Sequence, residues 1–303
     1  MSRDSLDDQV RAVLDKAAAH LAVPAHDARL LHLHSNASFA LPSAGLVVRI
    51  ATNPAALERV TASIAITRWL AGLGFPCVIP ADIDDQPLVI DGHVVSIWRY
   101  VPTADSPAPT GADIGRVLHA LHAQDDPPAP LRQLDDPFAS VAAALDEAPD
   151  SMPETSRDWL AERISWLRGQ WSAMNFPLPA GLIHGDAHIG NLMRTAGGEV
   201  ILGDWDHVAI GPREWDVVQI HYMQRRFGRA GDGGIEAFSA AYGRDIRGWP
   251  GLETLIAIRE ITGLSPYIRS ARDKPFSGQQ LAYRLRTLRG GDTSARWESP
   301  AEE

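Results

Sequence analysis

The sequence predicts an α+β fold in two parts: a small sheet-containing part to about residue 101, then a mainly helical part over 102–303. Short alternating runs of apolar and polar residues fill much of the stretch from residue 29 to residue 100, which is typical of strands. A proline-rich stretch at 102–110 interrupts them, and beyond it apolar residues recur at helical spacing. The hydrophobic content of 45% and charged content of 22% are those of an ordinary globular protein.

The first part is expected to contain a helix, a sheet, one crossing helix and more sheet. The predicted helices cover 6–22 and 53–72, and the predicted strands cover 29–35, 38–41, 45–51, 87–90 and 93–100. Asn53 and Pro54 form a cap and first turn for the second helix. Within 45–51, side chains alternate between faces, so Arg49 lies on the face opposite Val48.

Capping signals start the helices of the second part. Thr110 with Asp113 begins one helix, and Ser151 with Glu154 is a capping-box pattern ahead of a helix over 159–174. Further helices are predicted at 213–226, 234–242, 252–271 and 277–289. The segment from residue 290 onward, rich in Gly, Ser and Glu, is expected to be frayed.

Charge and cysteine usage exclude several classes of protein. The net charge of −10 argues against a nucleic-acid surface. The N-terminus has no hydrophobic signal core and no apolar run reaches the length of a membrane span, so a cytoplasmic protein without membrane partners is expected. The single cysteine, Cys77, excludes an internal disulfide, and its apolar neighbours predict a buried, inert thiol.

Two neighbouring segments carry the chemistry: His-Gly-Asp-Ala-His-Ile-Gly-Asn at 184–191 and Gly-Asp-Trp-Asp at 203–206. The apolar run before Gly185 delivers Asp186 to a loop. The turn signals at 195–198 predict a hairpin that brings Asp204 back beside Asn191. These segments supply one carboxylate and a separate amide-plus-carboxylate pair. Such groups can accept a hydroxyl proton and hold Mg²⁺ on ATP.

The pattern H-x-D-x-x-x-x-N followed by an Asp resembles a kinase catalytic loop and metal loop. Its His-Gly-Asp form resembles the aminoglycoside phosphotransferase and small-molecule kinase family. The resemblance implies a two-lobed protein-kinase-like fold. It also implies transfer of the γ-phosphoryl group of ATP, or GTP, to a hydroxyl of a small molecule with Mg²⁺.

The resemblance also assigns roles to individual residues. Asp186 matches the catalytic aspartate, and Asn191 and Asp204 match the Mg²⁺ ligands. His184 and a later aspartate, Asp216, match residues that brace the catalytic loop. His188 lies two residues after the catalytic aspartate, and the resemblance implies that it contacts the γ-phosphate.

On the nucleotide side, residues 34–39 match the phosphate-covering hairpin, where Ser35 and Ser38 could contact phosphates; an ordinary β-turn is the alternative. Leu46–Arg49 resembles the kinase strand V-A-I-K, with Arg in place of Lys.

The helix position that the family fills with Glu is Ser63, and Glu58 lies five residues earlier, on another side of the helix. The Lys–Glu pair is therefore expected to be absent. The segment 96–102 matches the interlobe hinge, with Arg99 and Val101 as candidates to pair with adenine.

Two alternatives remain at this stage. The alternating residues His184, Asp186 and His188 could bind Zn²⁺ on an extended segment. A kinase-like module could also bind nucleotide without turnover.

The acceptor could be an antibiotic, a sugar or a metabolite. From residue 220 onward the chain has 13 Lys/Arg against 10 Asp/Glu. The basic residues include Arg225, Arg226 and Arg229. This balance favours a neutral or anionic alcohol at least as much as a polycationic one.

Overall fold

The computed structural model describes residues 3–33, 36–51, 53–104, 107–128, 130–231 and 233–299. The chain divides into two compact units. The first comprises Met1–Ala108, Gln124–Leu131 and Gly190–Val208, and the second comprises Pro109–Ala123, Arg132–Ile189 and Ala209–Glu303. The predicted α+β class is confirmed, because the first unit contains a small antiparallel sheet and the second is mainly helical. The predicted division into 1–101 and 102–303 stays a prediction.

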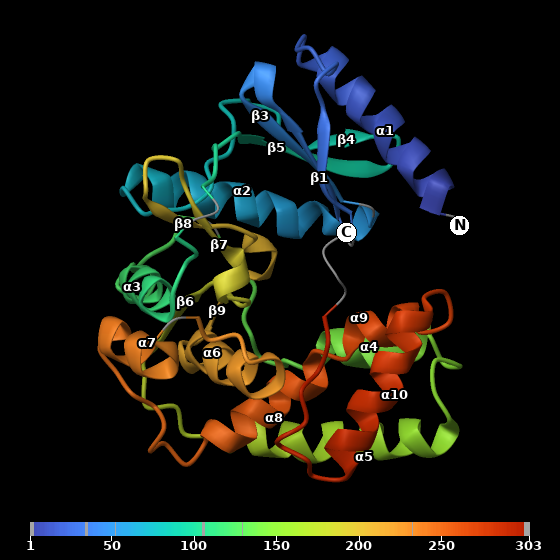
Figure 1. Ribbon diagram of the computed structural model, residues 1–303, viewed down its shortest axis with the longest axis vertical. Helices are drawn as coiled ribbons and strands as arrows, with labels where there is room; N and C mark the ends of the chain where they lie inside the picture. The colour runs from blue at the N-terminus through green and yellow to red at the C-terminus, as the bar shows by residue number, and fades with distance from the viewer. Residues whose placement is uncertain are drawn as a thin grey trace. The chain divides into compact units, whose positions relative to one another are not determined.

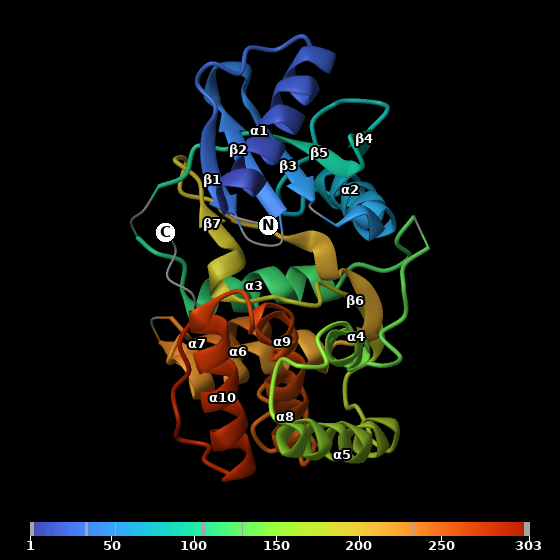
Figure 2. The same cartoon turned by 90° about the vertical axis from the view of Figure 1, so that its right-hand side faces the viewer.

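The first unit is built on an antiparallel sheet with the strand order β1-β2-β3-β5-β4. Its strands are β1 (Arg29–Leu33), β2 (Asn36–Leu41), β3 (Leu46–Ala51), β4 (Leu88–Ile90) and β5 (His93–Arg99). A short turn, η1 (Pro42–Ala44), joins β2 to β3, and the helices are α1 (Arg3–His20), η2 (Pro54–Ala56) and α2 (Leu57–Gly72). Helices α1 and α2 cover opposite faces of the sheet (Figures 1 and 2).

The alternation along β3 follows the predicted faces. Val48 and Ile50 pack in the apolar cluster with α1, whereas Val47 and Ala51 pack in the cluster with α2. Arg49 therefore belongs to the α2 face. It pairs across the sheet with Ser38 on one side and with β5 on the other.

The predicted hairpin is present and belongs to the first unit. Strands β7 (Leu192–Arg194) and β8 (Val200–Leu202) pair antiparallel between the turns η3 (Ile189–Asn191) and η4 (Trp205–His207). Leu202 fixes the hairpin to the segment after α2, since its carbonyl accepts from Val78 N at 3.0 Å and its N–H donates to Pro76 O at 2.9 Å. Turn η4 packs against α2.

The second unit surrounds a short two-stranded sheet, β6 (Ala180–Ile183) with β9 (Ala209–Pro212). Its helices are α3 (Gly111–His122), α4 (Ala139–Glu147), α5 (Glu154–Ser172), α6 (Glu214–Phe227), α7 (Gly234–Tyr242), α8 (Leu252–Thr262), α9 (Ser265–Ser270) and α10 (Pro275–Arg289). Thr110 and Asp113 form the predicted capping box of α3. Helices α3 and α7 approach so closely at Gly115 that a Cβ there would lie only 2.6 Å from Phe238 O.

The second part differs from the sequence analysis in several features. Helix α4, which has no side-chain cap, was not predicted. The predicted helix over 252–271 is two helices that part at Gly263–Leu264. Helix α5 begins after Pro153 without a side-chain cap, so the capping box assigned to Ser151 does not form.

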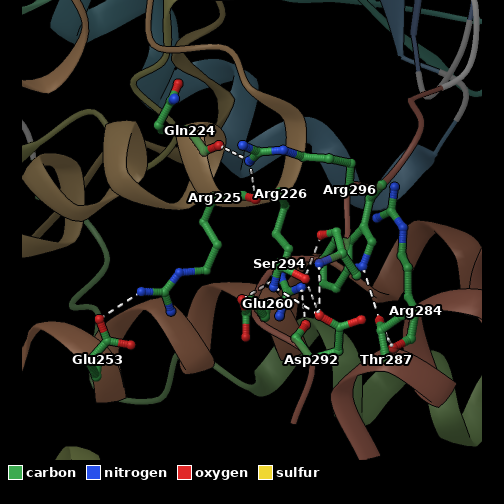
Figure 3. Close-up of polar contacts among 12 residues, drawn as sticks. Gln224, Arg225, Arg226, Glu253, Glu260, Arg284, Thr287, Asp292, Ser294 and Arg296 are labelled. Carbon is green, nitrogen blue, oxygen red and sulfur yellow. Dashed lines mark hydrogen bonds and ion pairs between the residues drawn. The ribbon is translucent and has the colours of Figure 1, made fainter. Parts of the chain in front are cut away.

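The chain after Gly290 is also not a frayed end as far as residue 299. Its part Asp292–Trp297, called the terminal segment below, packs on α6 and α10 (Figure 3). Arg226 donates to Asp292 O at 2.7 Å, and Trp297 is only 4% exposed. No described helix combines the length and the apolar character needed to cross a membrane.

Candidate functional site

The loop that carries Asp186 is fixed to the start of α6 by a buried carboxylate. Strand β6 ends at Ile183, and the N–H groups of His184 and Gly185 both donate to Asp216, at 2.7 and 2.8 Å. Gly185 has φ +87°, a conformation that side-chain-bearing residues rarely adopt, and its carbonyl accepts from Trp215 Nε1 at 3.0 Å. His184 and Asp216 are thus joined by a backbone hydrogen bond and both are buried, and their loop-bracing role stays a prediction.

Asp216 remains a carboxylate despite its burial. Burial alone would raise its pKa, but hydrogen bonds from His122 and from the backbone N–H of His184 outweigh it, so the pKa of Asp216 lies below its usual value. His122 Nε2 is 3.2 Å from Asp216, and its Nδ1 is 2.8 Å from Tyr242 Oη. His122 was not predicted, because only the folding of α3 against this loop brings it there.

Asp186 is held at one oxygen and is partly open. Gln219 Nε2 on α6 donates to Asp186 Oδ1 at 2.8 Å, and His188 Nε2 is 3.8 Å from Oδ2. The Asp186 side chain is 33% exposed, so the carboxylate is accessible from solvent. A buried cation, Arg259, stacks on Trp215 at 3.7 Å; burial lowers its pKa to about 10, and the charges of Asp186 and Asp216 oppose that shift.

In the first unit the hairpin brings Asn191 and Asp204 to adjacent positions. Gly203 N donates to Asn191 O at 2.8 Å, so the residue next to Asp204 pairs directly with Asn191. Asp204 has φ +54° and its side chain is 43% exposed. An amide oxygen and a carboxylate, completed by phosphate oxygens and water, suit Mg²⁺, which takes few ligands from the protein itself.

The zinc alternative gains no support. His184 is buried, and its Nδ1 accepts from Asp186 N at 3.3 Å. Among the residues that the structure describes, no three or more His, Cys, Asp or Glu side chains are grouped so as to hold a metal ion. The single thiol, Cys77, is buried, and burial raises its pKa to about 12.

Arg49 grips two carboxylates of the segment 203–206. Its Nη1 and Nη2 donate to the two oxygens of Asp206, at 3.0 and 2.9 Å, and Nη2 also donates to Asp204 Oδ1 at 2.9 Å. Ser63, the helix position expected to lack a carboxylate, is buried, and its hydroxyl has no partner. Asp206 was missed, although its signal, a second acid two residues after Asp204, was visible in the sequence.

The remaining nucleotide-side candidates differ in what they offer. Ser38 is the cross-strand neighbour of Arg49, whereas Ser35 lies outside the described residues. The N–H of Arg99 donates to Ile79 O at 2.9 Å and so is already engaged. Val101 follows β5 and is partly exposed, which leaves it as the better candidate of the two hinge residues.

The arginines at the end of α6 are largely neutralised by α8. Arg225 pairs with Glu253 at 2.6 Å, and the buried Arg226 pairs with Glu260 at 2.6 Å (Figure 3). Arg229 is exposed. A cavity of about 490 Å³ lies beside Arg225 and His221. His221 projects roughly 200° round α6 from Gln219, so this cavity lies on the side of α6 away from the contact to Asp186.

Comparison with known proteins gives a family and a fold. Residues 28–255 match the model of the phosphotransferase enzyme family. An amicoumacin kinase, solved with AMP-PNP, Ca²⁺ and its ligand Ami, superposes with a TM-score of 0.70 at 12% identity, over 98% of each chain. A choline/ethanolamine kinase family protein from Mesorhizobium loti has a TM-score of 0.61 at 19% identity, covering 91% of this chain and 94% of the other.

A third structure, APH(2")-IIia with GDP and kanamycin, has a TM-score of 0.63 at 16% identity, covering 88% of this chain and 94% of the other. These likenesses confirm the kinase-like fold that the His-Gly-Asp motif implied, and the match to the family model covers most of the chain. The chain therefore belongs to the phosphotransferase enzyme family and is a kinase-like phosphotransferase.

Proposed function

We propose that this protein transfers the γ-phosphoryl group of ATP to a hydroxyl group of a small molecule, with Mg²⁺. The observation that carries the proposal is the braced loop: Asp216 binds two successive N–H groups, and the loop then presents the partly exposed carboxylate of Asp186. The hairpin that sets Asn191 beside Gly203-Asp204 supports it. Nucleotides are bound in two of the similar structures.

The chain's own residues divide the reaction between them. Asp186, oriented by Gln219, accepts the proton of the acceptor hydroxyl while the hydroxyl oxygen bonds to the γ-phosphorus and the bond to the β–γ bridging oxygen breaks. ADP leaves with that oxygen. Asn191 and Asp204 would hold Mg²⁺, which neutralises charge on the phosphates.

Other side chains would position the nucleotide. Arg49 would supply a fixed positive charge to the phosphates, and Ser38, with Ser35 by the resemblance, would contact them. Val101, with Arg99, would meet the base. His188, beside Asp186, is proposed to contact the transferred group.

For the acceptor we propose an alcohol that is not strongly cationic, such as a sugar, a metabolite or an antibiotic of that kind. A polycation needs a carboxylate-rich pocket. From residue 220 onward, however, the chain carries 13 Lys/Arg against 10 Asp/Glu and so has no excess of carboxylates.

The proposal is tested with ATP, Mg²⁺ and a library of alcohols, after a thermal-shift panel of nucleotides. Asp186→Asn should reduce product formation by about a thousandfold or more and leave the melting temperature close to that of the wild type. Asp158→Asn, a matched change at an exposed site on α5, should turn over normally. Equal turnover by wild type and Asp186→Asn would refute the mechanism.

A second candidate is a module that binds nucleotide without turnover. The contact between Arg49 and Asp204 favours it, because the guanidinium competes with a metal ion for Asp204 Oδ1. Under this candidate, nucleotide binds with or without Mg²⁺, and neither ATP hydrolysis nor acceptor phosphorylation appears. Turnover of any library member would exclude it.

A further inference from the structure

Arg49, the proposed phosphate-binding arginine, has no carboxylate partner on α2, the helix on which a kinase-like protein is expected to supply one. Helix α2 contains a single acidic residue, Glu58, and it is exposed. Ser63 takes the expected carboxylate position, but it is buried and its hydroxyl is without a partner. Some other group must orient Arg49, since an unpaired arginine side chain samples many rotamers.

The carboxylate that does so comes from 157 positions later in the chain. Asp206 accepts from both Nη1 and Nη2 of Arg49, at 3.0 and 2.9 Å, in a fork that fixes the guanidinium plane as well as its position. A lysine has a single nitrogen and cannot form this two-nitrogen fork, which explains why Arg at position 49 and Asp at position 206 suit each other.

Two further side chains contact Asp206, and its neighbour Trp205 anchors the turn that carries it. Asn36 Nδ2 on β2 donates to its Oδ2 at 3.3 Å, and Arg59 Nε on α2 lies 3.7 Å from the same oxygen. The adjacent Trp205 anchors turn η4: its ring packs edge-on against Phe75 at 5.9 Å, and its Nε1 donates to Leu202 O at 3.1 Å.

The two aspartates that Arg49 contacts differ in exposure, and this difference separates their roles. The side chain of Asp206 is 8% exposed, whereas that of Asp204 is 43% exposed. Asp206 is therefore the partner that stays with Arg49, while Asp204 is accessible to a metal ion. The three bonds to the aspartates use three of the five guanidinium N–H groups, so the other two can bind phosphate oxygens.

We propose that Asp206 is the positioning residue of the nucleotide site: it takes the part of the missing helix carboxylate and aims Arg49 at the phosphates of the nucleotide. This inference rests on the proposed function. It adds a residue to which the resemblance gave no role, and it places the orienting carboxylate on the metal-binding hairpin instead of α2.

The test is a double-mutant cycle read by calorimetric binding of Mg·AMP-PNP to the full chain. Asp206→Asn should weaken binding at least tenfold, and Arg49→Gln should weaken it further. The double variant should bind like Arg49→Gln alone, because Asp206 acts through Arg49. Asp91→Asn is the matched control: Asp91 pairs with Lys16 at 2.6 Å in the same unit and should leave binding unchanged.

Each outcome decides the question. If the effects of the two changes multiply, Asp206 acts through the shape of the hairpin and the inference is overturned; it is overturned equally if Asp206→Asn binds like wild type. If Asp206→Asn does not fold, Asn36→Ala replaces it and should weaken binding about threefold; unchanged affinity would refute the inference. Wild type that fails to bind Mg·AMP-PNP overturns the proposed function together with the inference, a result distinct from the others.

Discussion

Replacing Asp216 by Asn tests how the catalytic loop is held. The substitution keeps the shape of the side chain but removes its charge and turns one acceptor oxygen into a donor NH₂. Asp216 Oδ1 accepts from Gly185 N, and Oδ2 accepts from His184 N and His122 Nε2. In its best orientation, Asn would keep the bonds at Oδ2 and set its NH₂ against the N–H of Gly185.

The expected cost follows from these contacts. One charge-assisted hydrogen bond is lost, which is worth about 1.5–3 kcal/mol, and one buried N–H is left without an acceptor, which costs about 1–3 kcal/mol. Asp216→Asn should therefore lower the free energy of unfolding by about 3–5 kcal/mol, a large share of the ~5–15 kcal/mol typical of a domain. His122→Leu removes only the 3.2 Å contact and the one to Tyr242, so about 1–2 kcal/mol is expected.

The assay is urea denaturation followed by circular dichroism and by hydrogen exchange at the amide of Gly185. Asp158→Asn serves as control and should leave the midpoint unchanged, since that carboxylate is exposed on α5. The pKa of Asp216 is lowered by folding, so its contribution is present above the unfolded pKa of about 3.9 and is lost as the pH falls below it. A midpoint for Asp216→Asn equal to that of the control would refute the account of the loop.

Three further changes test other parts of the second unit. Gly185→Ala forces an L side chain to φ +87° and should destabilise by about 1–2 kcal/mol, seen as a lower melting temperature; an unchanged value would contradict the assigned conformation. Trp297→Ala empties a site between Arg226 and Arg284, whose guanidinium carbons lie 4.6 and 4.7 Å from the ring, and should cost about 3–5 kcal/mol in urea denaturation; a loss under about 1 kcal/mol would show that the terminal segment is not docked. Burial lowers the pKa of His221 to about 4, so the unfolded state binds a proton at a higher pH than the folded state does. The free energy of unfolding should therefore fall by up to about 3 kcal/mol between pH 6.5 and pH 4. His221→Gln should show a smaller fall, and a pH profile identical to that of the wild type would contradict this explanation.

The elements that the sequence predicted well are those with local signals at both ends. Helix α7 has the predicted bounds because Gly233 and Gly243, both with positive φ, flank it. The α3 cap at Thr110 and the turn between β7 and β8 are likewise set by a few neighbouring residues. Local hydrogen bonds decide such features, so spacing along the chain is enough to predict them.

What the sequence did not predict depends on contacts between distant residues. Spacing along α2 points to Ser63 as the partner position of Arg49, whereas the partner, Asp206, lies on turn η4, directly after the hairpin. Gln219 and His122 likewise meet Asp186 and Asp216 only after α6 and α3 pack. Spacing rules relate residues on one element and carry no information about which surfaces of two elements will meet.

The apolar packing extends well past the stretch that aligns with the family, residues 28–255. Helix α1, which precedes that stretch, contributes Val10, Val13 and Leu14 to the cluster over the sheet, and all three are almost fully buried. Trp297, which follows it, is packed between two arginines. An expression fragment cut at the alignment limits would expose apolar surface to water and would be prone to aggregate. Alignment limits mark where relatives can be compared residue by residue, whereas the limits of a folding unit lie where its apolar interior is closed.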